Sequence, residues 1–250
     1  MIDIHSHIIP GIDDGPATLA QSKNLLRAAI AQGTTFMMST SHMTPGVYPN
    51  SPAKIRSNFK KLVDNLGDLK DQIQLGCSAE VRVGHEMVPL VERNEIPWLG
   101  ELDGNKVILL ELPHTHVPLE AKNIIRWLVT RGIRPLIAHP ERNAEIMRVH
   151  RRSHELADIG CLFQVTAASL YGASGPHSNR SAEKLAKDDL IYVIASDAHN
   201  TEYRPPGLMA GFRAAERLVG SAKAADMVFE HPWLIAQSHF RHVRSPDVVV

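Results

Sequence analysis

The sequence contains little that would cross-link the chain or place it in a membrane. Its 250 residues include only two cysteines, Cys77 and Cys161, which are too few for a disulfide framework and fit a reducing cytosol. The N-terminus has neither the basic nor the apolar stretch of a secretory signal. The longest apolar runs, such as Val107–Leu110 and Leu234–Ala236, are far shorter than a bilayer-spanning helix. We therefore expect a cytoplasmic protein with no direct membrane insertion.

The chain also lacks an excess of charge of either sign. Lysine plus arginine number 27, as do aspartate plus glutamate, so no global positive field attracts a polyanion, and we expect no nucleic-acid partner. The composition, 44% hydrophobic and 22% charged, is typical of a globular protein. No repeat or long linker divides the chain, so we expect a single domain over residues 1–250, with a short closing segment from about His231 to a loosely ordered end at Val250. Histidine, by contrast, is abundant, with 14 copies.

Short apolar runs rich in β-branched residues alternate with longer amphipathic stretches, which is the pattern of consecutive strand–helix units. The runs predicted to be strands are Ile2–His7, Thr35–Ser41, Gln74–Glu80, Lys106–Leu112, Arg134–His139, Leu162–Thr166 and Ile191–Asp197. Seven such units in a row favour an α/β fold with a parallel sheet. Periodicity does not distinguish an open, doubly wound sheet from a closed barrel, so both alternatives stay open at this point.

The stretches between the strands are predicted to be helices, namely Thr18–Gln32, Pro52–Leu69, Leu119–Arg131, Ala144–Ile159, Ser178–Lys187 and Gly207–Val219. The first of them carries the clearest boundary signals. Thr18 and Gln21 can form a capping box at its N-terminus, and Gly33 can end it. Glycine or proline near several other ends supports those boundaries to within a few residues.

Histidines and acidic residues gather at the C-terminal ends of six of the seven predicted strands. They are His5, His7, His42, Glu80, Glu111, His139, Asp197 and His199. The i, i+2 spacing of His5 and His7 places both side chains on one face of an extended strand. In parallel α/β folds this end of the strands is where the functional site is built. One such histidine alone would more often be a core residue, but eight such residues at one end of a sheet predict a metal site.

The predicted ligand set indicates which ions would bind. Neutral imidazoles together with carboxylates are ligands for zinc, manganese and iron, whereas calcium takes only oxygen. Eight ligands exceed the needs of one ion and suit two or three ions that share bridging carboxylates, as in two-metal hydrolases. The cysteines belong to no Cys-x-x-Cys pair, so we expect both to be small buried residues. His114 and His116 lie in a predicted loop, where we expect them to face solvent rather than substrate.

These residues stand in longer motifs that run through almost the whole chain. In sequence order the motifs are MIDIHSHIIPGIDDGP (1–16), SH (41–42), SAE (78–80), LELP (110–113), IAHPER (137–142), QVTAASLYG (164–172), SDAHN (196–200) and RPP (204–206). In these motifs the chain resembles the polymerase and histidinol phosphatase (PHP) superfamily. Within it, the chain is similar to the manganese-dependent tyrosine phosphatases of bacterial capsule and exopolysaccharide gene clusters. The resemblance implies a distorted seven-stranded (β/α) barrel of the PHP type.

The resemblance also implies three divalent metal ions, with manganese expected and iron or zinc as alternatives. The implied ligands of the first ion are His5, His7, Glu80 and Asp197. Those of the second are Glu80, Glu111 and His139. Those of the third are Asp14, His42 and His199. Arg142 and Arg204 would bind the phosphoryl oxygens as bidentate forks, and His199 is a candidate general acid. The chain departs from the family at Ser41 and Met43, where the family usually carries Pro and a second His. We expect this to change loop stiffness and pocket lining while His42 stays a ligand.

The implied reaction is hydrolysis of phosphotyrosine in proteins by a metal-bound hydroxide. The implied partner is a bacterial tyrosine kinase that controls capsular or exopolysaccharide synthesis. A cysteine phosphatase is excluded, because it needs an arginine six residues after the cysteine and the chain has Val83 and Ala167 there. The alternatives are a small-molecule phosphomonoesterase such as a histidinol-phosphate phosphatase, a non-catalytic metal-binding PHP module and, less favoured, a nuclease. Whether the chain forms a homo-oligomer also stays open.

Overall fold

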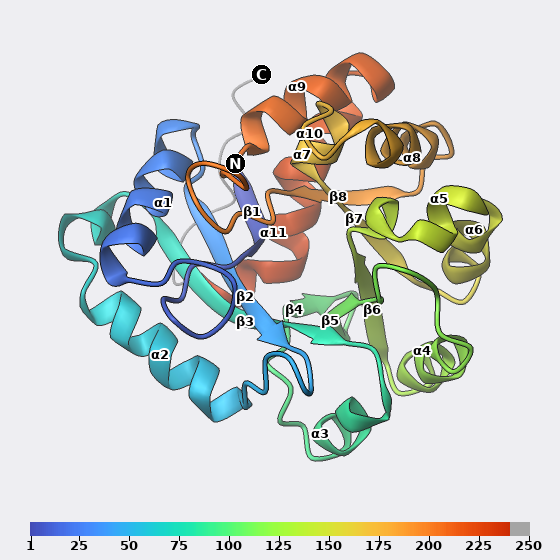
Figure 1. The fold of residues 1–250 in the computed structure, drawn as a ribbon, viewed down its shortest axis with the longest axis horizontal. Helices are drawn as coiled ribbons and strands as arrows, with labels where there is room; N and C mark the ends of the chain where they lie inside the picture. The colour runs from blue at the N-terminus through green and yellow to red at the C-terminus, as the bar shows by residue number, and fades with distance from the viewer. Residues whose placement is uncertain (241–250) are drawn as a thin grey trace.

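Seven parallel strands form a nearly closed barrel in a computed structural model that describes residues 1–240 (Figure 1). The strands are hydrogen-bonded in the order β1-β2-β3-β5-β6-β7-β8. Their bounds are β1 (Ile2–Ser6), β2 (Phe36–Met43), β3 (Gln74–Arg82), β5 (Asn105–Glu111), β6 (Ile133–Ala138), β7 (Leu162–Thr166) and β8 (Ile191–Ala195). All seven strands predicted from the sequence are present, and every end lies within two residues of its predicted place.

The barrel closes between β1 and β8 at the C-terminal ends of these two strands. The amide of His7 donates to the carbonyl of Ala198 (2.8 Å), and the amide of Asp197 donates to the carbonyl of His5 (2.8 Å). An isolated parallel bridge joins Ser6 to Ala198 at the same place. Of the two folds that the strand pattern leaves open, the barrel is therefore correct. Its closure also joins the two segments that carry His5, His7 and Asp197.

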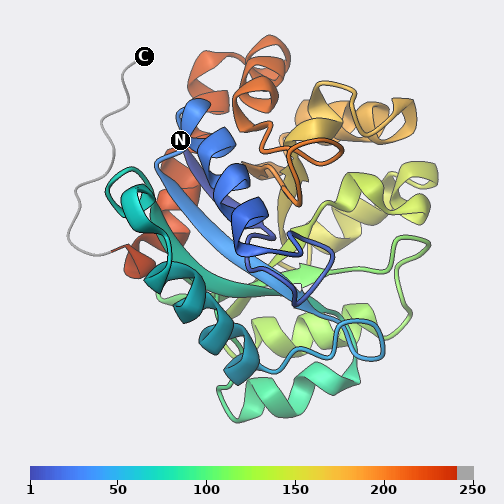
Figure 2. The ribbon, with the colours of Figure 1, turned by 60° about the vertical axis from the view of Figure 1, so that its left-hand side comes forward.

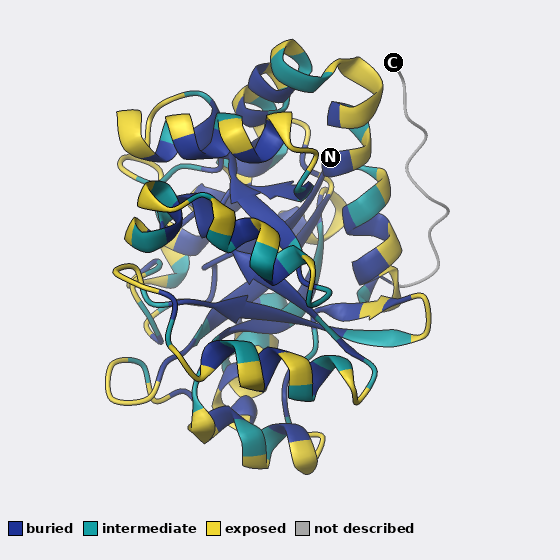
Figure 3. Ribbon diagram, turned by 90° about the vertical axis from the view of Figure 1, so that its right-hand side faces the viewer, coloured by how far each residue is buried: buried dark blue, intermediate teal, exposed yellow. Residues whose placement is uncertain are grey.

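The helices surround the barrel and turn their buried faces toward the strands (Figure 3). Their bounds are α1 (Leu19–Ala31), α2 (Pro52–Asp64), α3 (Val88–Glu92), α4 (Ala121–Val129), α5 (Ala144–Arg148), α6 (Arg151–Ala157), α7 (Ala167–Leu170), α8 (Pro176–Lys187), α9 (Leu208–Val219), α10 (Ser221–Val228) and α11 (Glu230–Ala236). Helix α2, for example, packs along β3 (Figure 2). This arrangement leaves the C-terminal ends of the strands covered only by loops.

Helix α1 begins and ends as predicted. The Thr18 hydroxyl accepts from the amide of Gln21 (3.3 Å), and the Gln21 side chain accepts from the amide of Thr18 (3.1 Å). Gly33, just past the helix, takes a positive φ of 85°, which glycine adopts without a steric cost. The local sequence therefore determines both ends of this helix.

Some helix boundaries differ from the prediction. The single helix predicted over 144–159 is two helices, because Val149 between α5 and α6 has a non-helical backbone (φ −124°, ψ 77°). The helix predicted over 52–69 ends at Asp64, and Gly67 (φ 68°) begins a separate 3-10 turn, η1 (Gly67–Asp71). The short strand β4 (Gly100–Leu102), antiparallel to β5, and helices α3, α7 and α10 have no counterpart in the prediction.

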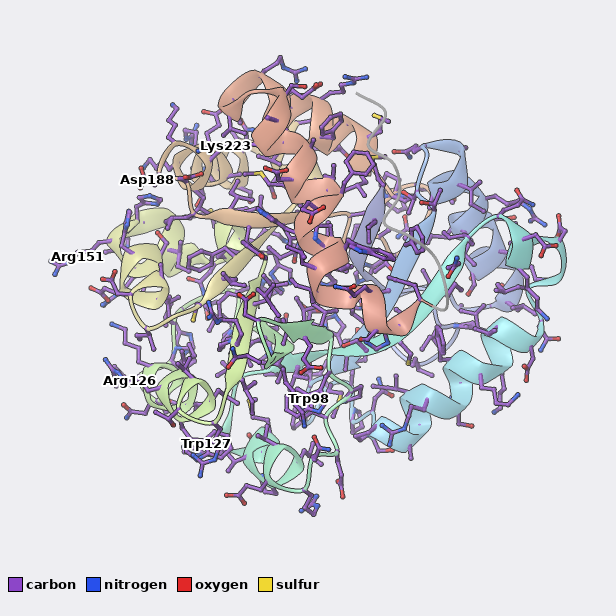
Figure 4. All side chains as sticks on the ribbon, turned by 180° about the vertical axis from the view of Figure 1, so that it is seen from behind. Trp98, Arg126, Trp127, Arg151, Asp188 and Lys223 are labelled. Carbon is purple, nitrogen blue, oxygen red and sulfur yellow. The ribbon has the colours of Figure 1, made fainter. Side chains whose placement is uncertain are left out.

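The C-terminal segment covers the N-terminal end of the barrel. Trp233 of α11 is buried with its ring edge-on to Phe36 at the start of β2, with 5.4 Å between ring centroids. The ring of Phe240 also lies edge-on to that of Phe36, with 4.9 Å between ring centroids. In Figure 4, which views the molecule from behind, this last helix crosses the strands. The closing segment predicted from about His231 is therefore largely helical up to residue 240, and its remainder, residues 241–250, lies outside the described residues.

Candidate metal centre

All nine side chains predicted as metal ligands lie together at the C-terminal end of the barrel. They form overlapping groups in which the ligand atoms lie within 4.8 Å of one another: His5, His7 and Glu80; His5, His139 and Asp197; His42, Glu80 and Glu111; and His7, Asp14, His42 and His199. Eight of them stand on or just after six strands, because parallel strands bring their C-terminal ends to one edge. The loop after β1 supplies the ninth, Asp14. The fold therefore brings all nine side chains to one place.

The innermost group consists of His5, His7, Glu80 and Asp197, which are all fully or almost fully buried. The Nε2 atom of His5 lies 3.3 Å from Oδ1 of Asp197 and 3.4 Å from Oε2 of Glu80. The Nε2 atom of His7 lies 3.5 Å and 3.4 Å from the same two oxygens. Ligands about 2.1 Å from a tetrahedral metal ion are about 3.4 Å from each other. Each of the two histidine nitrogens therefore lies at coordination-shell spacing from both carboxylate oxygens.

Glu80 links this group to its neighbours. Its Oε2 atom faces the innermost group and also lies 3.0 Å from Nδ1 of His42. Its other oxygen, Oε1, lies 2.8 Å from Nε2 of His139. A carboxylate whose two oxygens face different nitrogen ligands has the geometry of a bridge between two ions.

Asp14, His42 and His199 form the outer side of the centre. Oδ1 of Asp14 lies 3.3 Å from Nε2 of His42 and 3.2 Å from Nε2 of His199. The ring of His7 stacks on that of His199 at 3.9 Å, so His7 borders this group as well. The replacements at Ser41 and Met43 leave His42 in reach of both Asp14 and Glu80. Asp14 is also the most exposed of the nine, at 37% of its side chain, which places this group toward solvent.

Glu111 and His139, which the resemblance pairs on one ion with Glu80, share no group among the described residues. Glu111 instead lies beside His42, with 3.8 Å between its Oε2 and the Nδ1 of His42. Nη2 of Arg82 lies 2.9 Å from the same Oε2 atom of Glu111. The sequence reasoning missed Arg82, although its i, i+2 spacing from Glu80 on β3 places both side chains on one face.

Two further side chains orient the innermost histidines. Nδ1–H of His5 donates to Oε1 of Gln164 (2.7 Å), and Nδ1–H of His7 donates to Oδ2 of Asp13 (3.1 Å). Each bond leaves the lone pair of Nε2 directed into the centre, as in metal-bound histidines. Both residues lie in the quoted motifs, but only the contact with a histidine reveals their role. Gln164 lies on β7, so the one strand that carries no predicted ligand also supplies a side chain to the centre.

Several buried polar atoms of the centre make no hydrogen bond within the described residues. They include Nδ1 of His42, Oε2 of Glu80, Oδ1 of Asp197 and Nε2 of His199. A buried polar atom without a partner costs about 1–3 kcal/mol, so such atoms are rare in folded proteins. These nitrogen and oxygen atoms point to one small region, and divalent cations would satisfy them. The residues present therefore fit the metal ions that the resemblance implies.

The carboxylates of the centre are held in their ionised form, and they raise the pKa values of His5 and His7 against the effect of burial. Burial opposes ionisation of Glu80 and Asp197, but the histidines around them hold both pKa values well below the usual range. Burial lowers the pKa of His139 to about 4, so this imidazole is neutral at pH 7. Burial also opposes protonation of His42, but the charge of Glu80 raises its pKa to about 9. A cation that binds at His42 therefore has to displace a proton.

Two of the ligands have unusual backbone geometry. His139 and Asp197 have φ angles of 33° and 52°, in the left-handed region that residues other than glycine rarely adopt. Both stand just past the end of a strand, where this turn redirects the chain. Such a conformation costs about 1–3 kcal/mol and is typical of functional sites.

Arg142 and Arg204 reach the centre from its open side. Nη1 of Arg142 and Nη2 of Arg204 each donate to Oδ2 of Asp197 at 2.7 Å. Nη1 of Arg204 also donates to Oδ2 of Asp14 (3.1 Å). The two arginines line a pocket of about 210 Å³ together with Asp14, His42, Tyr48, Arg82, Glu111, His114 and His139. Guanidinium groups at the wall of such a pocket suit an anionic ligand such as a phosphate ester.

Two aromatic rings form part of the pocket wall. Tyr48 stacks on His42 with 5.2 Å between centroids and 6° between planes. His114 stacks on His139 at 5.7 Å and 28°. His114 is exposed, as expected, and it also lies at the pocket wall. His116 is exposed, as expected.

The cysteines take no part in the centre. Cys161 is buried and Cys77 is partly buried, and neither forms a disulfide. Burial raises the pKa of each thiol to about 12, so both are protonated at physiological pH. A thiolate nucleophile is therefore not available from either residue.

One more cluster of possible ligands lies away from the barrel end. Nε2 of His150 (2.8 Å) and Nε2 of His154 (2.7 Å) both lie close to Oδ2 of Asp188, which Figure 4 labels. Asp188 caps α8, and the two histidines stand at the start of α6 and within it. The contacts tie these two helices together on the surface.

A barrel that carries histidines, carboxylates and arginines at the C-terminal ends of its strands defines a metal-dependent hydrolase. The comparisons with known proteins narrow this class. The chain belongs to the CpsB/CapC family of capsular polysaccharide synthesis, whose family model matches residues 1–237. The resemblance found in the sequence is thus confirmed.

Individual relatives agree with this family. The chain is 37% identical to the tyrosine-protein phosphatase YwqE of Bacillus subtilis over 206 residues, which covers 82% of this chain and 79% of YwqE. It is 29% identical to the tyrosine-protein phosphatase CpsB of Streptococcus pneumoniae over 237 residues, covering 93% and 96% of the two chains. A crystal structure from a study of these two proteins, described as unique metal-dependent tyrosine phosphatases, superposes with a TM-score of 0.87. That match has 32% identity and covers 98% of each chain, and it confirms the predicted barrel.

Proposed function

We propose that this protein is a metal-dependent protein-tyrosine phosphatase that holds three divalent cations, manganese in preference to iron or zinc. Its substrate would be a bacterial tyrosine kinase that regulates capsular or exopolysaccharide synthesis, in the cytoplasm, and residues 1–250 would act as one phosphatase domain. One observation carries the proposal. Nine candidate ligand side chains cluster at the end of the barrel, and four of them line a pocket with three arginines, in a chain whose relatives are named tyrosine-protein phosphatases. No helix among the described residues has the length and apolar character needed to cross a membrane.

The geometry supports an assignment of ligands to the cations. His5, His7, Glu80 and Asp197 would hold the first, because each histidine Nε2 lies 3.3–3.5 Å from an oxygen of both carboxylates. The outer group, Asp14, His42 and His199, would hold another. The family resemblance assigns the third to Glu80, Glu111 and His139, of which Glu80 contacts His139 directly and Glu111 lies beside His42. When bound, the cations would lower the pKa of a coordinated water toward neutrality and offset the charge of the phosphoryl group.

The remaining pocket residues would orient the substrate. Arg142 and Arg204 would bind the non-bridging phosphoryl oxygens and stabilise the charge of the transition state. Tyr48 and His114 would flank the phenyl ring of phosphotyrosine, since aromatic rings pack favourably against one another. Burial lowers the pKa of His199 to about 4, and its Nδ1–H donates to the carbonyl of Asp197 (2.8 Å). A neutral His199 with Nε2 directed inward suits a ligand better than a general acid.

A side-by-side turnover assay tests the proposal. Manganese-loaded protein would receive a phosphotyrosyl peptide and histidinol phosphate, with Glu80→Gln in parallel to exclude a contaminating phosphatase. We expect faster turnover of the peptide and loss of that turnover in the variant. Faster turnover of histidinol phosphate would identify a small-molecule phosphomonoesterase instead. Inertness on every phosphoester would identify a non-catalytic module, and strong cleavage of DNA a nuclease.

A further inference from the structure

A groove of about 840 Å³ lies next to the metal centre. One wall is the segment that follows β3, with Val83 and Glu86, and the other is the loop of residues 113–120 between β5 and α4. Arg82 lines both this groove and the pocket that contains the catalytic metal ligands. The two cavities therefore adjoin at one side chain, and a substrate bound in the pocket has the groove directly beside it.

The mouth of the groove exposes apolar side chains. Leu119 is 95% exposed, and Pro45, Val83 and Pro118 line the same groove. The two next most exposed large hydrophobic residues described are Tyr203 (87%) and Val47 (65%), and both also lie in loops at the C-terminal end of the barrel. Leu119 lies on the groove itself and Val47 on the metal pocket, and exposed apolar side chains beside a site are typical of an interaction surface. A small phosphate ester held in the pocket would leave them in water.

The loop that forms one wall is held in shape by hydrogen bonds. The Asn143 side chain donates to the carbonyls of Pro113 (2.6 Å) and His116 (2.9 Å). The amide of Val117 donates to Oε2 of Glu145 (3.0 Å). The same loop carries His114, which lines the metal pocket, so it runs from the centre to the groove. Because the wall is already fixed, a ligand loses little free energy in ordering it.

The charges of the groove indicate which side chains it would accept. Lys122 and Arg152, on its floor, are already paired with Glu145 and Glu155. Glu86 and Glu120 line the groove as well, and both are exposed and form no ion pair within residues 1–240. The uncompensated charge of the groove is therefore negative. It complements a basic side chain and repels an acidic one.

We propose that this groove binds the polypeptide that flanks the phosphotyrosine of a protein substrate. An apolar side chain of that segment contacts Leu119, and a basic side chain lies near Glu86 and Glu120. This inference rests on the proposed function and deepens it, because it specifies what distinguishes a protein substrate from a small ester. The pocket alone binds the phosphotyrosyl group, and the groove adds affinity only for a chain that continues beyond it.

The first test replaces the exposed leucine. Leu119→Asn should lower kcat/KM for a phosphotyrosyl peptide with apolar and basic flanking residues by about tenfold, mainly through KM. It should leave kcat/KM for p-nitrophenyl phosphate, which does not reach the groove, within twofold of wild type. The matched control is Leu234→Asn, at an exposed leucine on α11, which should leave both substrates unaffected. A Leu119→Asn protein with wild-type kinetics on the peptide would overturn the inference.

The second test addresses the charges. Wild-type protein should prefer a peptide with lysine beside the phosphotyrosine over the same peptide with glutamate, and the preference should fall as salt is added. The double variant Glu86→Gln, Glu120→Gln should lose that preference. Equal turnover of the two peptides by wild type, or an unchanged preference in the double variant, would contradict the assigned charges.

Different outcomes would contradict the proposed function and the role of the groove. If manganese-loaded wild type hydrolyses p-nitrophenyl phosphate but no phosphotyrosyl peptide, then the proposed function is wrong. If it hydrolyses the peptides and neither groove variant alters their kinetics, then the proposed function stands and the groove does not bind substrate.

Discussion

Replacing Asp13 with asparagine should weaken metal binding without unfolding the barrel. The Asp13 carboxylate accepts from Nδ1–H of His7 (3.1 Å) and from the amide of Gly15 (3.1 Å). Burial opposes its ionisation, but the hydrogen bond with His7 lowers its pKa to about 2, so it is anionic at pH 7. Asparagine keeps the shape and loses the charge. Loss of a group that orients a metal-binding histidine typically costs about 10–100-fold in affinity, or about 1.4–2.7 kcal/mol.

The assay for this prediction is a manganese titration of phosphatase activity on the metal-stripped protein. The midpoint should rise about 10–100-fold in Asp13→Asn, while the circular dichroism spectrum stays that of wild type. Asp64→Asn is a suitable control, because Asp64 is an exposed aspartate on α2 that pairs with Lys60 (2.7 Å) far from the centre. A midpoint in Asp13→Asn within twofold of wild type would refute the role assigned to this carboxylate.

Three further predictions follow from the same structure. Trp233→Ala should destabilise the protein by about 3–5 kcal/mol in urea denaturation, because the ring is buried against β2; a loss below about 1 kcal/mol would mean that α11 does not close the barrel. Arg204→Ala should lower kcat/KM about 100-fold at saturating manganese, with partial recovery in Arg204→Lys, whereas unchanged efficiency would remove its phosphate-binding role. Iodoacetamide at pH 8 should leave activity intact, because Cys77 and Cys161, with pKa values raised to about 12, are thiolate in only about one molecule in ten thousand; rapid inactivation would contradict this.

The strands and the ligand cluster were predictable because their signals are local. Each strand is a short β-branched run, and parallel strands bring their last residues to one edge whatever the details of packing. His5, His42 and Glu80 are therefore expected together as soon as their strands are assigned. Asp14 differs, since it lies in a loop, and only the resemblance to a known family pointed to it.

Other features depend on contacts that no local pattern encodes. Gln164 and Asp13 matter through the histidine nitrogens they face, and Arg82 through its ion pair with Glu111. The closure of the barrel rests on two hydrogen bonds at the C-terminal ends of β1 and β8, and an open sheet would have the same hydrophobic periodicity. Helix α11 is short and forms because Trp233 packs against the barrel, so its own sequence predicts it weakly.

The central claim is that phosphotyrosine hydrolysis depends on metal ions held by this cluster. The most direct test removes the metal with a chelator, adds manganese back, and measures bound metal by mass spectrometry alongside turnover of a phosphotyrosyl peptide. The account predicts no turnover in the stripped protein, recovery as about three ions bind per chain, and both fewer ions and no recovery in Glu80→Gln. Full turnover by the metal-free protein, or by a Glu80→Gln protein that binds no manganese, would contradict it.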